Sequence, residues 1–172
     1  MTNILKGLFF ILVFINMAQA KTFSIEDGAI SFDGPKGFEL MTPELLQIKY
    51  PRGNPPKNVL VNESTGTSIV FASRGKSIAQ SDIEKVLKAY EIQFKRLVGG
   101  FELKVSKVAN ISGQKWAQLE FISNTIDSKV YNILLVTGYK NKMLIFNFNS
   151  TLKEFEDYKS AFKKSIKSIT LK

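Results

Sequence analysis

Apolar and polar residues alternate in the first part of the chain, which is the period of a β-strand with one buried face. Residues 23–25 and 30–32 form two such runs, and Asp27-Gly28 between them permits the positive backbone angles of a hairpin turn. Residues 59–61 and 67–72 repeat this arrangement around a polar turn. The pattern therefore predicts two strand pairs before residue 73.

In residues 81–98 the apolar residues recur three and four positions apart instead of alternating with polar ones. Ser81 and Glu84 match a capping box, and two glycines that follow Val98 supply a stop. The apolar positions in between recur on one face of a helix: Ile83, Val86, Leu87, Tyr90, Phe94, Leu97 and Val98. We expect a long helix with one buried face.

The period returns to two from residue 101. Residues 101–105 and 117–121 each carry an apolar face and a polar face, whereas 130–136 and 143–148 are apolar on almost both faces. We therefore expect the last two runs to be central strands that are covered on both sides.

The chain closes with a second long helical pattern. Thr151 and Glu154 match another capping box, and the acidic residues of the sequence EFEDY favour the positive end of the helix dipole. The apolar stripe that must lie on the sheet consists of Phe155, Tyr158, Phe162, Ile166 and Ile169. The predicted fold class is α+β, an antiparallel sheet flanked by two long helices and one short helix.

The short helix precedes a proline-rich loop. Thr42 can cap it and Pro43 suits its first position, while Pro51 prevents its extension. The loop is stiff, so its charged and aromatic groups would lose little entropy on binding. Its candidate binding residues are Lys49, Tyr50, Arg52 and Lys57. A turn that only steers the chain into the next strand is the structural alternative.

The single tryptophan, Trp116, lies on the strand face opposite Ala117, Leu119 and Phe121. Burial under a helix is its ordinary role, because an indole ring supplies a large apolar surface. An exposed anchor for a ligand or partner is the alternative, which makes Trp116 the last candidate binding residue.

The first twenty residues match a secretory signal peptide. Lys6 lies near the amino terminus, residues 8–15 are apolar, and residues 18–20 have the small-x-small pattern of a cleavage site. The apolar run is far shorter than the roughly 20 residues that a spanning helix needs. We expect residues 1–20 to be a signal peptide and 21–172 to be one domain, periplasmic or secreted and without a stable membrane anchor after cleavage.

The composition excludes most catalytic designs. The chain has no His and no Cys, so imidazole and thiolate sites for metals or nucleophilic catalysis are absent. A Ser-Lys pair, a carboxylate pair and a calcium site remain, but none shows a motif. We expect no enzyme activity, no cofactor and no metal site.

The formal net charge is +9, from 24 basic and 15 acidic residues. Such an excess can attract nucleic acid, anionic lipid, acidic polymers or acidic proteins. The basic residues are scattered, with no run of five or more. Because export also argues against nucleic acid, we expect no nucleic-acid partner.

The layout resembles the PsbP-like superfamily, which includes PsbP, Mog-type and DcrB-like proteins. The resemblance rests on three stretches of sequence: ISFDGPKGFELM, NISGQKWAQLEF and FKKSIKSITL. It implies a PsbP-like sandwich, in which a curved antiparallel sheet is flanked by helices, used by non-enzymatic proteins that bind or assemble with other proteins.

These observations favour a periplasmic or secreted non-enzymatic binding protein that engages another envelope or secreted protein, as an accessory or immunity-type factor. A carrier that holds a small hydrophobic or anionic ligand between the sheet and the helix at 81–98 is the alternative. An envelope enzyme with a Ser-Lys or carboxylate pair is a third hypothesis.

Overall fold

A computed structural model describes residues 20–51 and 55–172 of the chain. Apart from Ala20, the predicted signal peptide lies outside the described residues, and so does Arg52. Within the described part, no helix is both long enough and apolar enough to cross a membrane.

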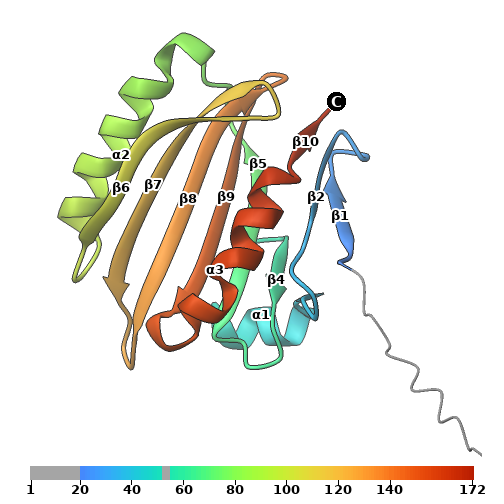
Figure 1. Cartoon of the computed structure of the whole chain (residues 1–172), viewed down its shortest axis with the longest axis vertical. Coiled ribbons are helices and arrows are strands. Elements are labelled where there is room, and N and C mark those ends of the chain that lie inside the picture. Colours follow the sequence, from blue (N-terminus) through green and yellow to red (C-terminus); the bar gives the residue numbers. More distant parts are fainter. Residues whose placement is uncertain (1–19, 52–54) are drawn as a thin grey trace, which may run out of the picture.

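The described residues form ten strands and three α-helices (Figure 1). The helices are α1 (Pro43–Lys49), α2 (Ile83–Leu97), which follows a 3₁₀ turn, and α3 (Leu152–Lys167). The strands are β1 (Thr22–Ile25), β2 (Ile30–Asp33), β3 (Glu39–Leu40), β4 (Val59–Val61), β5 (Thr67–Arg74), β6 (Glu102–Ile111), β7 (Gln114–Asn124), β8 (Lys129–Tyr139), β9 (Lys142–Thr151) and β10 (Thr170–Leu171).

Seven strands pair antiparallel in the order β3-β4-β5-β9-β8-β7-β6. The remaining strands form a small sheet in the order β1-β2-β10. The α+β class is confirmed, and β8 and β9 lie inside the large sheet as their apolar runs predict. The small sheet's third strand, β10, was not predicted.

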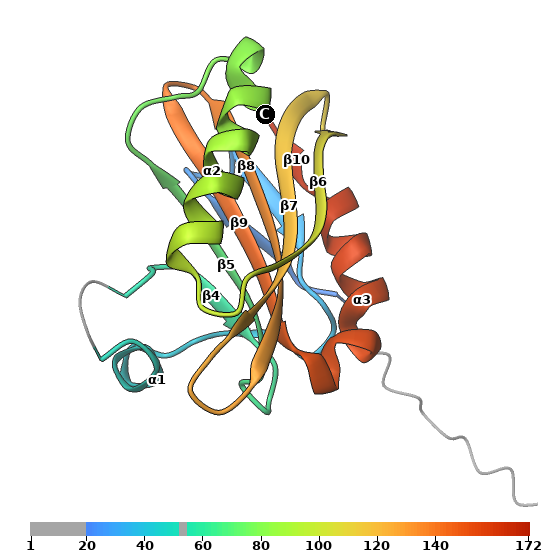
Figure 2. The ribbon, with the colours of Figure 1, turned by 90° about the vertical axis from the view of Figure 1, so that its left-hand side faces the viewer.

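The two faces of the large sheet are covered differently (Figure 2). On one face, α3 and the small sheet bury a layer rich in phenylalanine, with Phe146 in contact with three other phenylalanine rings and Trp116. On the other face, α2 packs on an aliphatic layer centred on Leu119 and Val136. A smaller cluster, formed by Met41, Val59 and Val61, lies under α1.

Both predicted capping boxes are wrong. The 3₁₀ turn that holds Ser81 precedes α2, and Asp82 at the N-cap position makes no side-chain capping bond. Thr151 stands at the N-cap of α3, but its side chain also makes no capping bond. Glu154 instead accepts hydrogen bonds from the turn between β4 and β5. At α1 the predicted cap is confirmed, because Thr42 Oγ1 accepts from the Leu45 amide at 3.4 Å.

The predicted inward face of β6 is only partly correct. Leu103 is 40% exposed, because the register shifts between Leu103 and Val105 where β6 pairs with β7. Such a bulge turns the following side chains relative to the preceding ones. β6 is also the last strand of the sheet, so it buries less apolar surface than the alternation alone indicates.

The stability of the fold should depend strongly on Phe146, whose ring is fully buried among aromatic neighbours. We expect Phe146→Ala to lower the free energy of unfolding by about 3–5 kcal/mol, because it leaves a cavity that the rigid sheet cannot fill. The fully exposed Ile126 is the control, and Ile126→Ala should change the value by less than about 0.5 kcal/mol. Urea unfolding followed by circular dichroism would measure both, and similar values for the two variants would contradict this assignment.

Candidate functional site

The turn between β4 and β5, residues 62–66, organises one end of the molecule. Asn62 closes it, because its amide donates to Thr67 O and its carbonyl accepts from the Thr65 amide, each at 3.1 Å. Thr65 has a φ of 58°, in the left-handed region. The Asn62 Oδ1 atom accepts from the Thr67 amide at 3.1 Å, so a local side-chain bond shapes the turn.

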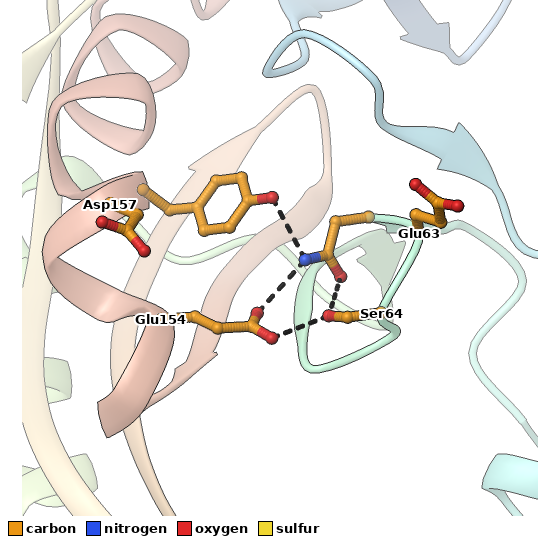
Figure 3. A pocket seen from close by; sticks show the side chains of 6 residues that line it. Glu63, Ser64, Glu154 and Asp157 are labelled. Atoms are coloured by element: carbon orange, nitrogen blue, oxygen red, sulfur yellow. Dashed lines mark hydrogen bonds between the residues drawn. The ribbon is translucent and has the colours of Figure 1, made fainter.

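Glu154 of α3 connects this turn to the helix (Figure 3). Its Oε1 atom lies 2.8 Å from Ser64 Oγ, and its Oε2 atom accepts from Thr67 Oγ1 at 2.6 Å. Asn62 Nδ2 donates to the same Oε2 at 3.1 Å and to the Tyr158 hydroxyl at 3.2 Å. One carboxylate therefore joins residues that are about ninety positions apart in the sequence.

The chemistry of Glu154 is that of an anchor. The hydrogen bond from Thr67 holds the pKa of Glu154 below its usual value, and the bonds from Ser64 and Asn62 act in the same direction against partial burial. A general acid or base at neutral pH requires a pKa near 7 and a free lone pair or proton. Glu154 is ionised and its oxygens are occupied by donors, so it does not fit that role.

A hollow of about 510 Å³ opens beside this network. Glu63 and Asp157 add two carboxylates to its lining (Figure 3). No group of three or more His, Cys, Asp or Glu side chains in the described residues is arranged to hold a metal ion. The acidic hollow contrasts with the positive charge of the whole chain.

A second hollow, of about 790 Å³, lies on the other side of the same turn, between α1 and the loop that joins β7 to β8. We call it the α1 groove. Its lining includes Lys49, Tyr50, Ser68, Ile126, Asn132 and Asn149. It opens on the sheet face that carries α1 and α2.

The floor of the α1 groove is a row of polar residues across three strands. Ser68 of β5 pairs with Asn149 of β9, which pairs with Asn132 of β8. Asn132 Nδ2 donates to Ser123 Oγ at 2.9 Å, which fixes the orientation of its amide. The floor thus carries amide and hydroxyl groups, of which Asn149 is partly exposed and Ser68 and Asn132 are buried.

The sides of the α1 groove combine charge with exposed apolar surface. Lys49 Nζ donates to the carbonyl of Thr65 at 2.9 Å, and the surrounding protein lowers the pKa of Lys49 by desolvation. Burial raises the pKa of Tyr50, which packs on the cluster under α1. Ile126 projects into solvent with its whole side chain exposed.

The five candidate residues from the sequence do not form one surface. Lys49 and Tyr50 lie together in the α1 groove. Lys57 lines a separate hollow with Arg74 and Lys142, and Arg52 lies outside the described residues. Trp116 is fully buried, and its Nε1 donates to Ile111 O at 3.1 Å. The structural role of Trp116 is therefore the correct one, and an exposed anchor is wrong.

The polar floor and the Glu154 network were not predicted from the sequence. The signal for the floor was present, because Asn132 and Asn149 interrupt the two most apolar strands. The network was hidden, because Glu154 also suits the first turn of a helix. The predicted ligand space between α2 and the sheet is occupied by Ile83, Leu87 and the aliphatic layer beneath them.

No family model and no curated protein matches the sequence. Solved structures do match the fold. The cyanobacterial PsbP (CyanoP) of Synechocystis superposes with a TM-score of 0.59 at 15% identity, and the match covers 93% of this chain and 96% of CyanoP. The antiparallel sheet and flanking helices are therefore those of the PsbP-like sandwich.

Two further proteins share this fold. LpqN, which is involved in cell envelope biogenesis of Mycobacterium tuberculosis, gives a TM-score of 0.58 at 15% identity, covering 91% of this chain and 87% of LpqN. The Saccharomyces cerevisiae Ran-binding protein Mog1p gives 0.55 at 14%, covering 90% and 96%. The predicted resemblance to the PsbP-like superfamily is confirmed at the level of the fold, which is all that identities this low can show.

The hydrogen bonds to Glu154 should make the stability of the protein depend on pH. We expect Glu154→Gln to lower the free energy of unfolding at pH 7 by about 1–3 kcal/mol, because bonds to a charged acceptor are replaced by mismatched donors. A group with a lowered pKa contributes stability above its unfolded pKa and loses it as the pH falls through the folded pKa. The difference between the wild type and Glu154→Gln should therefore shrink in acid.

The matched control for this prediction is Glu156→Gln on the same helix. Glu156 is exposed and pairs only with Lys159 among the described residues, so its effect should be small at every pH. Thermal and urea unfolding at neutral and acidic pH would measure both variants. A Glu154→Gln difference that stays constant into acid would show that ionisation does not hold the turn.

Proposed function

We propose that this protein is an exported, periplasmic or secreted, non-enzymatic binding protein that engages another protein through the α1 groove, as an accessory or immunity-type factor. The observation that carries the proposal is the groove itself. It combines a polar floor, the cation Lys49 and the exposed side chain of Ile126 in one hollow on the sheet face.

This combination suits a segment of a protein partner. The partly exposed amide of Asn149 can bond to a peptide backbone, whereas Ser68 and Asn132 beside it are buried. An apolar side chain at the rim supplies the anchor that such interfaces require. The groove walls come from α1, the β4–β5 turn and the β7–β8 loop, and Glu154 fixes that turn. A pre-organised wall reduces the entropy lost on binding.

The chemistry of the site supports binding over catalysis. Lys49, Tyr50 and Asp127 are the ionisable groups in the groove lining, and His and Cys are absent from the chain. Two proteins with this fold point in the same direction, because one takes part in cell envelope biogenesis and one binds Ran. The signal-peptide pattern of residues 1–20 supports export.

A small anionic ligand is the second candidate occupant of the same groove. Lys49 favours it, because a partly desolvated ammonium group interacts more strongly with an anion than one in bulk water. A carrier of this kind would release a small molecule on denaturation, which mass spectrometry detects.

Capture of the partner from an envelope extract of the native host tests the proposal. We expect wild-type protein to retain one partner in stoichiometric amount, and Ile126→Asp to lose it because a charge replaces the apolar anchor. Since Ile126 is fully exposed, thermal unfolding should not change. Leu40→Asp is the matched control, because Leu40 is also an exposed apolar residue but does not line the groove. Equal retention by both variants would contradict the groove as the binding site.

A further inference from the structure

The outward face of α2 has a composition that burial against the sheet does not explain. The helix packs on the sheet through Ile83 and Leu87, which are buried. Its opposite face carries Ile92, which is 62% exposed, and Leu97 at the end of the helix is 73% exposed. Figure 2 shows α2 as the outermost layer on this side of the molecule.

Cations surround these exposed apolar residues. With 3.6 residues per turn, positions 85, 88, 92, 95 and 96 share one face of the helix. The charged members of this face are Lys85, Lys88, Lys95 and Arg96, and all four are exposed. The face therefore places Ile92 among four basic side chains. We call it the basic face of α2.

One acidic residue of α2, Glu84, is exposed one turn before Lys88, and the two other acidic residues here lie at the edges of the basic face. Glu91 accepts from Ser106 Oγ of β6 at 2.9 Å, so it turns toward the sheet edge. Asp82 forms an ion pair with Lys85 at 2.9 Å, which neutralises one of the four cations. In the part of the chain that the structure describes, Lys88, Lys95 and Arg96 form no ion pair. Three positive charges therefore remain available around Ile92.

We propose that the basic face of α2 lies on an anionic lipid surface, with Ile92 at the level of the headgroups. A helix that adsorbs to such a surface combines apolar side chains with flanking Lys and Arg, as this face does. Each cation near an anionic leaflet adds to the attraction, and the attraction weakens with salt.

Other occupants fit this face less well. A second copy of the chain would bring Lys88 and Arg96 against the same cations of its partner, and like charges at an interface are unfavourable. A soluble polyanion would need the cations but not the exposed apolar residues.

Sedimentation with vesicles tests the proposal, using protein purified after expression of the full chain. The probes are vesicles of phosphatidylcholine alone and of phosphatidylcholine mixed with phosphatidylglycerol. We expect binding only to the mixed vesicles, with a decrease as salt is raised. Lys88→Glu combined with Arg96→Glu should lower the partition coefficient by more than about tenfold, because each cation contributes about fivefold.

The matched control reverses two charges on the other side of the sheet. Lys36 and Lys163 are exposed and lie outside α2, so Lys36→Glu with Lys163→Glu changes the net charge equally. The partition coefficient of this control on the mixed vesicles should stay within about threefold of the wild-type value, because its reversed charges act on the lipid only through long-range electrostatics. All variants keep the same residues 1–20, so any contribution of that segment cancels. Lys88→Gln with Arg96→Gln is the milder pair if charge reversal impairs folding, which thermal unfolding would reveal.

A third variant separates a lipid surface from a soluble polyanion. Ile92→Ser keeps every charge but removes the apolar group, so it should weaken vesicle binding severalfold. The proposal is overturned if the wild type ignores the mixed vesicles, or if the control loses as much binding as the α2 variant. It is also overturned if Ile92→Ser binds normally while soluble polyphosphate displaces the protein, because that pattern indicates a polyanion site.

Discussion

The packing of Phe146 of β9 against aromatic rings from three other strands is the contact on which the rest of the structure depends. The centroid of its ring lies 5.3 Å from the ring centroid of Phe32, 5.9 Å from that of Phe71 and 6.0 Å from that of Trp116. These partners come from the small sheet and from both sides of β9. Without disulfides, this packing is what holds the small sheet, α3 and the large sheet together.

The aromatic layer also determines where a binding groove can form. In β9 the layer uses every second residue, such as Phe146 and Phe148. The side chains between them point to the opposite face of the sheet. That opposite face is covered by α2 along β7 and by the short helix α1 near β4. Between them the strands carry Asn149 and Asn132 in place of aliphatic residues. The groove is therefore a gap in helical cover where the sheet itself is polar.

Much of the fold could be predicted because period and turn chemistry agree along most of the chain. The nearly continuous apolar run in 143–148 predicts a buried strand, and the stripe that includes Phe155 and Phe162 predicts the face of α3. The caps of the two long helices could not be predicted in this way. Glu154 could cap its own helix or bond to the segment between β4 and β5. It does the second, because it accepts from Asn62, Ser64 and Thr67, about ninety residues earlier in the chain. The spacing of residues in the sequence does not show which distant donors Glu154 will bond to in the folded protein.

The candidate site was harder to predict, for a related reason. Lys49 at the end of α1 and Tyr50 after it line the groove, but Lys57 lines another hollow. Residues close in sequence are thus divided between sites, while Ser68, Asn132 and Asn149 are brought together by strand register. A polar residue inside an apolar strand is informative only when the neighbouring strands are known.

The α1 groove and the basic face of α2 occur on the same side of the large sheet, and this arrangement constrains how both could work. A helix that adsorbs through Ile92 would turn this side toward the lipid. The groove would then face the space next to the membrane, where Ile126 and Lys49 could meet a segment of a membrane-bound partner. Adsorption would confine the protein to a thin layer, which raises the effective concentration of a partner held in the same layer. A weak contact in the groove would be sufficient under that condition, so a modest interface is compatible with a specific function.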